Sequence, residues 1–221
     1  MATDQTSEHL EEAKRLSTEL MRSLATLVYE SDYTFNSRLP FKAASLRELL
    51  AHRMYDLSQS AISNLDKNAV VPAATLTRAG LETVAILYCL NREMTNFFDS
   101  KDGGRINTFL MSSLTGSRDD DAPIRSVNVL NSIDKVAKEL PGFRQSYDNL
   151  SEYTHPNWSG LLGSYGTVDR EQHVLHLGIR DTTYGMRHTA HALAGSLHTF
   201  KHFYVQSGEA LFAFNRHFAE P

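Results

Sequence analysis

One segment, residues 73–90, constrains the fold more than any other part of the chain. It is apolar almost all round, with leucine, isoleucine and valine at positions that point in different directions on a helix. A helix without a polar face belongs at the centre of a bundle. Pro72 suits the first turn of this helix, which is expected to reach about Arg92. The chain is therefore expected to fold around one buried central helix.

Helical periodicity also dominates the rest of the chain. Apolar residues recur at helical spacing in residues 10–27 and again from Pro40 to Asp66. Shorter amphipathic helices are predicted at 127–140 and at 143–155. A long final helix is expected to run from about Tyr184, with Gly208 as a candidate position for a break. These segments predict an all-α protein.

Two segments are predicted to be loops and one a hairpin. Residues 100–105 and 115–123 are polar and rich in glycine or aspartate, which favours solvated loops. Residues 161–178 carry β-forming side chains on both sides of a polar turn, which predicts a small β-hairpin. The expected fold is a helical bundle of about six main helices with this hairpin as an insertion, in a single domain over residues 1–221.

The composition limits the compartment and the partners that we expect. One cysteine, Cys89, allows no intramolecular disulfide and suits a reducing compartment. The polar residues 1–10 do not look like a secretory signal, and the apolar run 81–90 is too short to cross a bilayer. We therefore expect a cytoplasmic protein with no membrane or disulfide partner. No nucleotide-loop or metalloprotease motif is present, so no cofactor is expected.

Two charges in the central helix predict a candidate site. Arg78 and Glu82 are the only charged residues in 73–90, and their spacing of four places them on one helical face. A buried charge without a partner costs several kcal/mol, so both need partners. The segment 143–158 can supply them: Arg144, Tyr147, Ser151 and His155 are expected on one face, followed by Asn157 and Trp158. These groups could transfer a proton or hold an anion.

The same residues carry a resemblance to known proteins. Arg78-x-x-x-Glu82 in an apolar helix, followed by Tyr147-x-x-Leu-Ser-Glu-Tyr-x-His-Pro-Asn157, resembles a pattern in uncharacterised bacterial helical proteins. Those proteins look like distant relatives of the HEPN superfamily, whose members include ribonucleases, toxins and proteins that bind nucleotides or other proteins. The resemblance covers residues 70–180.

The resemblance implies a homodimer with RNA or a nucleotide as partner. It implies a metal-independent ribonuclease, or a binding protein, with Arg78, Glu82, Ser151 and His155 as catalytic residues. In a ribonuclease, Arg78 would stabilise phosphate charge and His155 would move a proton. Arg144, Tyr147, Asn157 and Trp158 would then serve binding.

The spacing of the HEPN nuclease motif does not identify a different site. An arginine followed by four to six residues and a histidine occurs at Arg47–His52 and at Arg170–His176, as often as chance predicts. Arg47 and His52 are expected on the exposed side of their helix, and Arg170 in the hairpin turn. We therefore keep the nuclease hypothesis on Arg78 and His155.

Two alternatives stay open at this level. The Arg78 cluster could be a structural network inside a non-catalytic interaction or regulatory protein. The second alternative is a metal-binding protein that uses one face of the last helix, formed by His188, His191, His198 and His202. That face is otherwise expected to be a solvated surface or a dimer contact, so the first choice is no metal.

Overall fold

The computed structural model describes residues 2–178 and 182–219, and the side chains of residues 5–178 and 182–219. The long helices are α1 (Ala2–Ser23), α2 (Leu39–Asp66), α3 (Val70–Ser100) and α8 (Thr183–Ala219). The shorter ones are α4 (Gly103–Leu114), α5 (Val129–Ala137), α6 (Phe143–Thr154), α7 (Leu162–Tyr165) and the 3₁₀ helix η1 (Glu30–Asp32). Strands β1 (Gly166–Asp169) and β2 (Val174–Leu177) form an antiparallel hairpin. The expected all-α bundle with a small hairpin is confirmed.

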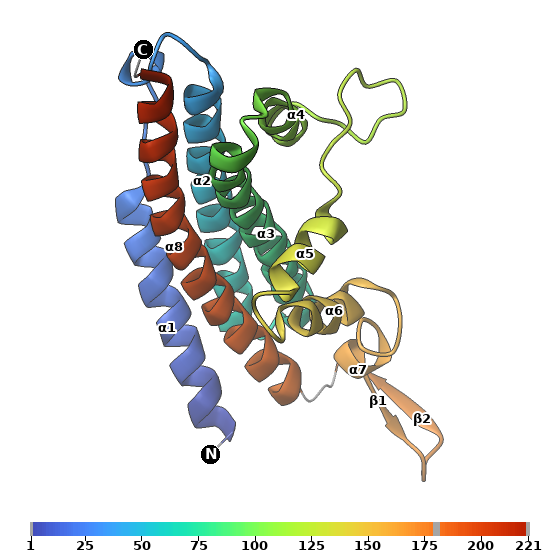
Figure 1. Ribbon diagram of the computed structural model, residues 1–221. Coiled ribbons are helices and arrows are strands. Elements are labelled where there is room, and N and C mark those ends of the chain that lie inside the picture. Colours follow the sequence, from blue (N-terminus) through green and yellow to red (C-terminus); the bar gives the residue numbers. More distant parts are fainter. Residues whose placement is uncertain (1, 179–181, 220–221) are drawn as a thin grey trace.

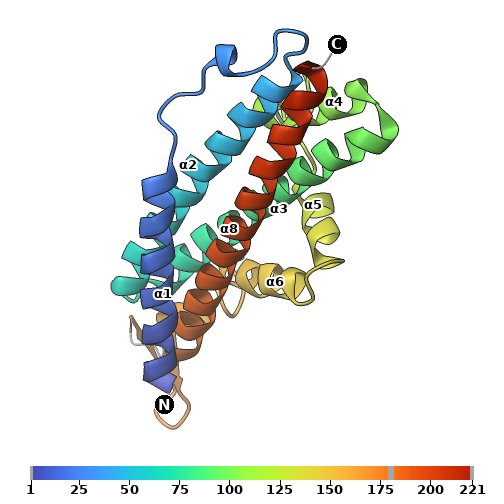
Figure 2. The ribbon, with the colours of Figure 1, turned by 60° about the vertical axis from the view of Figure 1, so that its left-hand side comes forward.

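Helix α3 is the centre of the bundle, as its sequence predicts. It packs against α2 and α8 and against the shorter α4, α5 and α6. Helix α1 lies along the outer side of α8, away from α3 (Figures 1 and 2). By length and composition alone, α3 is the described helix long and apolar enough to cross a membrane, and its apolar window is 56% buried inside the bundle. A core helix passes the same test.

Three of the predicted boundaries are wrong. Helix α3 begins at Val70 and continues past Arg92 to Ser100, because Met94 and Phe97 also face the core. The predicted loop 100–105 contains the start of α4, where the Asp102 side chain accepts a hydrogen bond from the backbone nitrogen of Arg105 at 2.9 Å. Such an N-cap can start a helix even at a glycine pair.

The third correction concerns Gly208, where α8 continues without a break. A Cβ atom added at this position would lie 3.4 Å from Nη2 of Arg47. Arg47 stacks on the Tyr204 ring, donates to the Ser207 hydroxyl at 3.0 Å and pairs with Glu48. The glycine therefore leaves space for the largely buried guanidinium of Arg47 from α2, and it does not end the helix.

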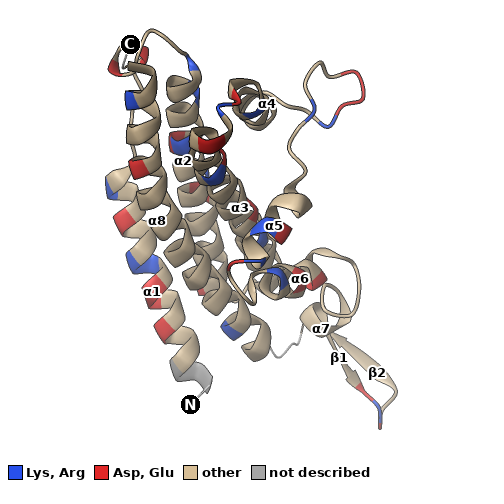
Figure 3. Cartoon of the chain, in the orientation of Figure 1, with Lys and Arg blue, Asp and Glu red and all other residues tan. Residues whose placement is uncertain are grey.

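The hairpin extends away from the bundle, as Figure 1 shows. Gly166 pairs with Leu177 and Asp169 with Val174. Its charged residues lie at the turn (Figure 3), where Asp169 Oδ1 accepts two backbone hydrogen bonds. Its apolar residues are largely exposed: Val168, Val174, Leu175 and Leu177.

Candidate functional site

Arg78, Glu82 and Tyr147 form one polar cluster between α3 and α6. The Tyr147 hydroxyl accepts a hydrogen bond from Arg78 Nη2 at 2.6 Å and donates one to Glu82 Oε1 at 3.0 Å. Arg78 Nη2 also lies 3.3 Å from Glu82 Oε1. The predicted pairing of the two charges with the segment after Phe143 is therefore found at Tyr147.

This cluster is partly buried. Tyr147 is buried, and the Arg78 and Glu82 side chains keep 29% and 23% of their exposure. Burial raises the pKa of Tyr147, so its hydroxyl stays protonated and can donate to the carboxylate. Arg78 Nε is buried and has no hydrogen-bond partner among the described residues. The contacts within the cluster are thus made by Arg78 Nη2, the Tyr147 hydroxyl and Glu82 Oε1.

His155 does not join this cluster. Helix α6 ends at Thr154, and His155 has extended backbone angles (φ −93°, ψ 146°) and an exposed side chain. Pro156 explains this geometry, because a proline disfavours helical angles at the residue before it. His155 therefore leaves the helical face on which it was expected. In the part of the chain that the structure describes, no hydrogen bond or ion pair joins it to Arg78.

The other predicted residues have separate partners. The Ser151 hydroxyl donates to the backbone oxygen of Tyr147 at 2.8 Å, within its own helix. Arg144 pairs at the surface with Asp134 and Asp148. The Asn157 amide donates to Glu152 and accepts from the Gly160 nitrogen, and Trp158 is 71% exposed. Of the eight residues expected at the site, three make direct side-chain contacts with one another: Arg78, Glu82 and Tyr147.

Glu82 also lines a cavity of about 320 Å³ that the sequence did not predict. The cavity lies between α2, α3, the end of α4 and the segment before α5. Its polar lining includes Arg53, Glu82, Thr83, Ser112 and Ser113, and its apolar lining Leu46, Leu50, Ile86, Val127 and Val129. No motif connects these residues, because four separate segments contribute them.

Several polar atoms at this cavity are free to bind. Arg53 Nε donates to the Thr83 hydroxyl at 3.2 Å, which leaves its two Nη groups without a partner among the described residues. Glu82 Oε2 accepts no hydrogen bond from a described residue. The Ser113 hydroxyl is buried and likewise without a partner in the described chain. The Arg53 and Glu82 groups are accessible to a ligand, and a buried hydroxyl without a partner, as at Ser113, is uncommon in folded proteins.

Gly116 lies beside the cavity, where residues 116–117 and 124–126 approach each other closely. The backbone nitrogen of Ser117 donates to Ile124 and that of Ser126 donates to Ser117, both at 3.0 Å. A Cβ atom at Gly116 would lie 2.7 Å from the Cα atom of Ser126. Only glycine permits this close approach of two backbone segments.

The Arg47–His52 pair does not form a second site of the nuclease type. Arg47 was expected on the exposed side of its helix, but its side chain is only 15% exposed and is held by the Tyr204 and Glu48 contacts. His52 is exposed, and its Nε2 lies 2.7 Å from the backbone oxygen of Ala25. The Arg47 side chain is thus held against the interior, where its guanidinium group stacks on the Tyr204 ring.

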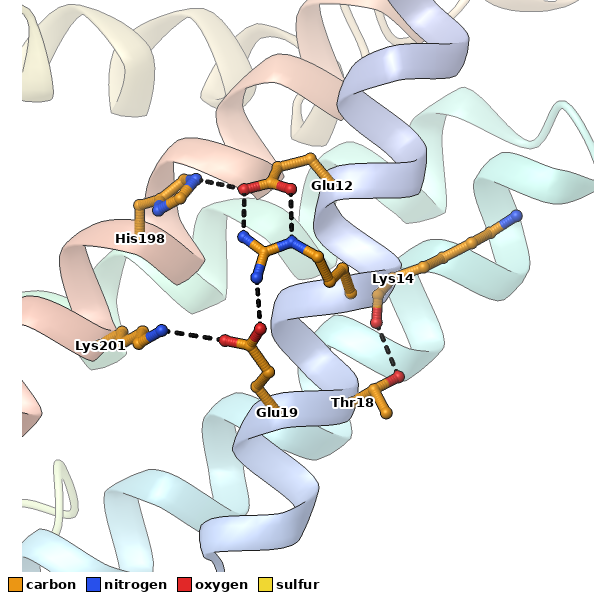
Figure 4. Close-up of polar contacts among 7 residues, drawn as sticks. Glu12, Lys14, Thr18, Glu19, His198 and Lys201 are labelled. Carbon is orange, nitrogen blue, oxygen red and sulfur yellow. Dashed lines mark hydrogen bonds and ion pairs between the residues drawn. The ribbon is translucent and has the colours of Figure 1, made fainter.

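The histidine face of α8 contacts α1 and α6. His198 pairs with Glu12 at 2.7 Å, and His191 Nδ1 lies 3.3 Å from Nε2 of His9 (α1). Figure 4 shows His198 and Lys201 of α8 turned toward Glu12 and Glu19 of α1. Within residues 5–178 and 182–219, no three His, Cys, Asp or Glu side chains gather in a way that could hold a metal.

His188 is the half-buried member of this face, and it predicts a pH effect. Burial lowers its pKa from 6.5, and Asn149 Nδ2 lies 3.3 Å from its Nε2, where a neutral ring can accept. Because the folded protein holds fewer protons than the unfolded chain, the contribution of His188 is complete above pH 6.5 and is lost as the pH falls toward the lower folded-state pKa. The free energy of unfolding should therefore fall less in His188→Asn than in the wild type between about pH 7.5 and about pH 5.5.

Urea denaturation at the two pH values measures this difference. The control is His173→Asn, since His173 is exposed in the hairpin turn and asparagine accepts its positive φ of 53°. An equal fall in wild type, control and His188→Asn would contradict the assignment.

Comparison with known proteins adds no family to this geometry. The resemblance to HEPN proteins therefore rests on the motif residues alone. No protein-family model, no curated protein and no solved structure matches the chain.

Proposed function

We propose that this chain is a HEPN-like helical module that binds a nucleotide, free or within RNA, and that the cavity beside Glu82 receives the base. The resemblance includes nucleotide-binding members and implies a homodimer, and the composition favours the cytoplasm. The observation that carries the proposal is the cavity itself, whose lining combines the polar side chains of Arg53 and Glu82 with aliphatic side chains.

The walls of the cavity suit a base. A volume of about 320 Å³ is at the small end of ligand pockets, which hold molecules of nucleotide size. Aliphatic side chains such as Leu50 and Ile86 can cover the flat faces of a base. Arg53 supplies donors and Glu82 Oε2 an acceptor, the two kinds of group that base edges require.

The polar cluster then has a supporting role. Glu82 Oε1 is held by Tyr147 and Arg78, so the carboxylate is fixed before the ligand arrives. A fixed acceptor loses little side-chain entropy on binding. In this proposal, Glu82 is a binding residue, and Arg78 and Tyr147 are positioning residues.

Titration calorimetry with the four ribonucleosides tests the proposal. We expect saturable binding of at least one of them by the wild type. Glu82→Gln and Arg53→Met should each weaken it about tenfold or more, which corresponds to one good hydrogen bond to a charged group. The matched controls are Glu8→Gln and Arg22→Met, because both residues are exposed on α1. No binding by the wild type, or unchanged affinity in Glu82→Gln, would contradict the proposal.

Cleavage of RNA is the alternative that the sequence predicts. The position of His155, exposed and without a bond to Arg78, favours binding over cleavage. Labelled single-stranded RNA incubated with the wild type in the presence of a chelator should therefore stay intact. Cleavage that His155→Gln abolishes and Glu82→Gln retains would replace the binding proposal.

A structural role for the cluster is the other alternative. Hydrogen bonds among Arg78, Glu82 and Tyr147 join α3 to α6, which is what a network that fixes helix register would do. Stability and binding measured on the same variants distinguish this structural role from a role in binding.

A further inference from the structure

A second cavity, of about 270 Å³, lies between α3, the start of α4 and α5. Its lining is dominated by cationic side chains from all three helices. Four basic residues line it: Arg92, Arg105, Lys135 and Lys138. The remaining lining residues are Tyr88, Cys89, Glu93, Asn96 and Glu139.

The two carboxylates of this cavity are already paired. Glu93 accepts two hydrogen bonds from Arg105, from Nε and Nη2, both at 2.9 Å. Glu139 accepts one from Arg92 Nη1 at 2.8 Å. These pairs leave three guanidinium positions free to donate, namely Nε and Nη2 of Arg92 and Nη1 of Arg105.

The two lysines have no such partner. Lys135 and Lys138 are exposed at the C-terminal end of α5, and no described carboxylate forms an ion pair with either. Cations at a helix C-terminus stabilise the helix, which accounts for lysines at this end. It does not account for their convergence with arginines from α3 and α4 around one cavity. The cavity therefore has an excess of two positive charges.

We propose that this cavity binds a small phosphate monoester. A phosphate dianion matches the two unpaired lysine charges, and its oxygens accept from the free guanidinium positions. Asn96 supplies an amide donor beside them. Burial and a hydrogen bond with Glu139 raise the pKa of Tyr88 to about 12, so its hydroxyl stays protonated at neutral pH. This site is separate from the cavity beside Glu82, and it stands whether or not a base binds there.

The test uses inorganic phosphate and glycerol 3-phosphate as probes on the full chain. Nuclear magnetic resonance should show saturable shifts of the Asn96 side-chain amide and of the Arg92 and Arg105 Nε–H signals. Sodium chloride at equal ionic strength should not reproduce them, because a built site discriminates phosphate from a simple anion. Tighter binding of glycerol 3-phosphate than of phosphate would identify the ester as the ligand. The reverse order would reassign the site to free phosphate.

The variant Lys135→Ala/Lys138→Ala should weaken the affinity for both probes about tenfold or more, since it removes both unpaired charges. The charge-matched control, Arg22→Ala/Lys67→Ala, removes two exposed cations elsewhere and should bind like the wild type. Equal affinity of the two double variants, or shifts that chloride also produces, would overturn the proposal. Both variants change surface residues, so a circular dichroism spectrum suffices to check that they fold.

Discussion

Replacing Phe214 by alanine is expected to lower the free energy of unfolding by about 4 kcal/mol, the cost typical of deleting a buried aromatic ring. Phe214 is fully buried near the end of α8. Its ring lies edge-on to Phe97 and to Phe218, with centroids 5.1 and 5.2 Å away. The ring therefore joins the end of α8 to the end of α3, and its loss would leave a cavity between them.

Phe212→Ala is a matched control, because the same change is made two residues away on an exposed side chain. Phe212 is 73% exposed, so we expect its replacement to change the free energy of unfolding by about 0.5 kcal/mol or less. Urea denaturation with the same slope for all three proteins measures both values. Similar small losses in the two variants would show that α8 does not pack on α3 beyond Gly208.

The long helices were predictable because their apolar pattern and their prolines agree. Helix α2 begins one residue before Pro40 and ends at Asp66, as expected. The end of α3 was missed because Asn91, Arg92 and Glu93 interrupt the apolar pattern. Glu93 is buried all the same, since Arg105 of α4 pairs with it. That contact is tertiary, and a local pattern cannot show it.

The candidate site was predictable in part for a physical reason. Two charges in a buried helix require partners, and that requirement led to Tyr147. The same argument failed for His155, because it extended the helical face through a residue that Pro156 holds in an extended conformation. The neighbouring cavity could not be predicted, since Arg53 and Ser113 carry no motif and meet only when α2 and α4 pack beside α3.

Removing one charge of the Arg78–Glu82 pair should cost about 2 kcal/mol of unfolding free energy. A fully buried pair costs more when broken, and the 29% and 23% exposure of these side chains reduces the effect. We expect Arg78→Met and Glu82→Leu each to show this loss. The double variant should lose clearly less than the sum, because neither charge is then left without its partner.

Nucleotide binding measured on the same three variants separates the two roles of the cluster. Glu82 contacts the ligand in our proposal, so the double variant should bind as weakly as Glu82→Leu, although its loss of stability is less than the sum. Arg78→Met retains the carboxylate and its bond to Tyr147, and it should bind more weakly than the wild type but better than either variant without Glu82. If the double variant lost less stability than the sum and bound like the wild type, the cluster would serve only to fix the packing of α3 on α6. The base would then have to bind without the carboxylate at position 82.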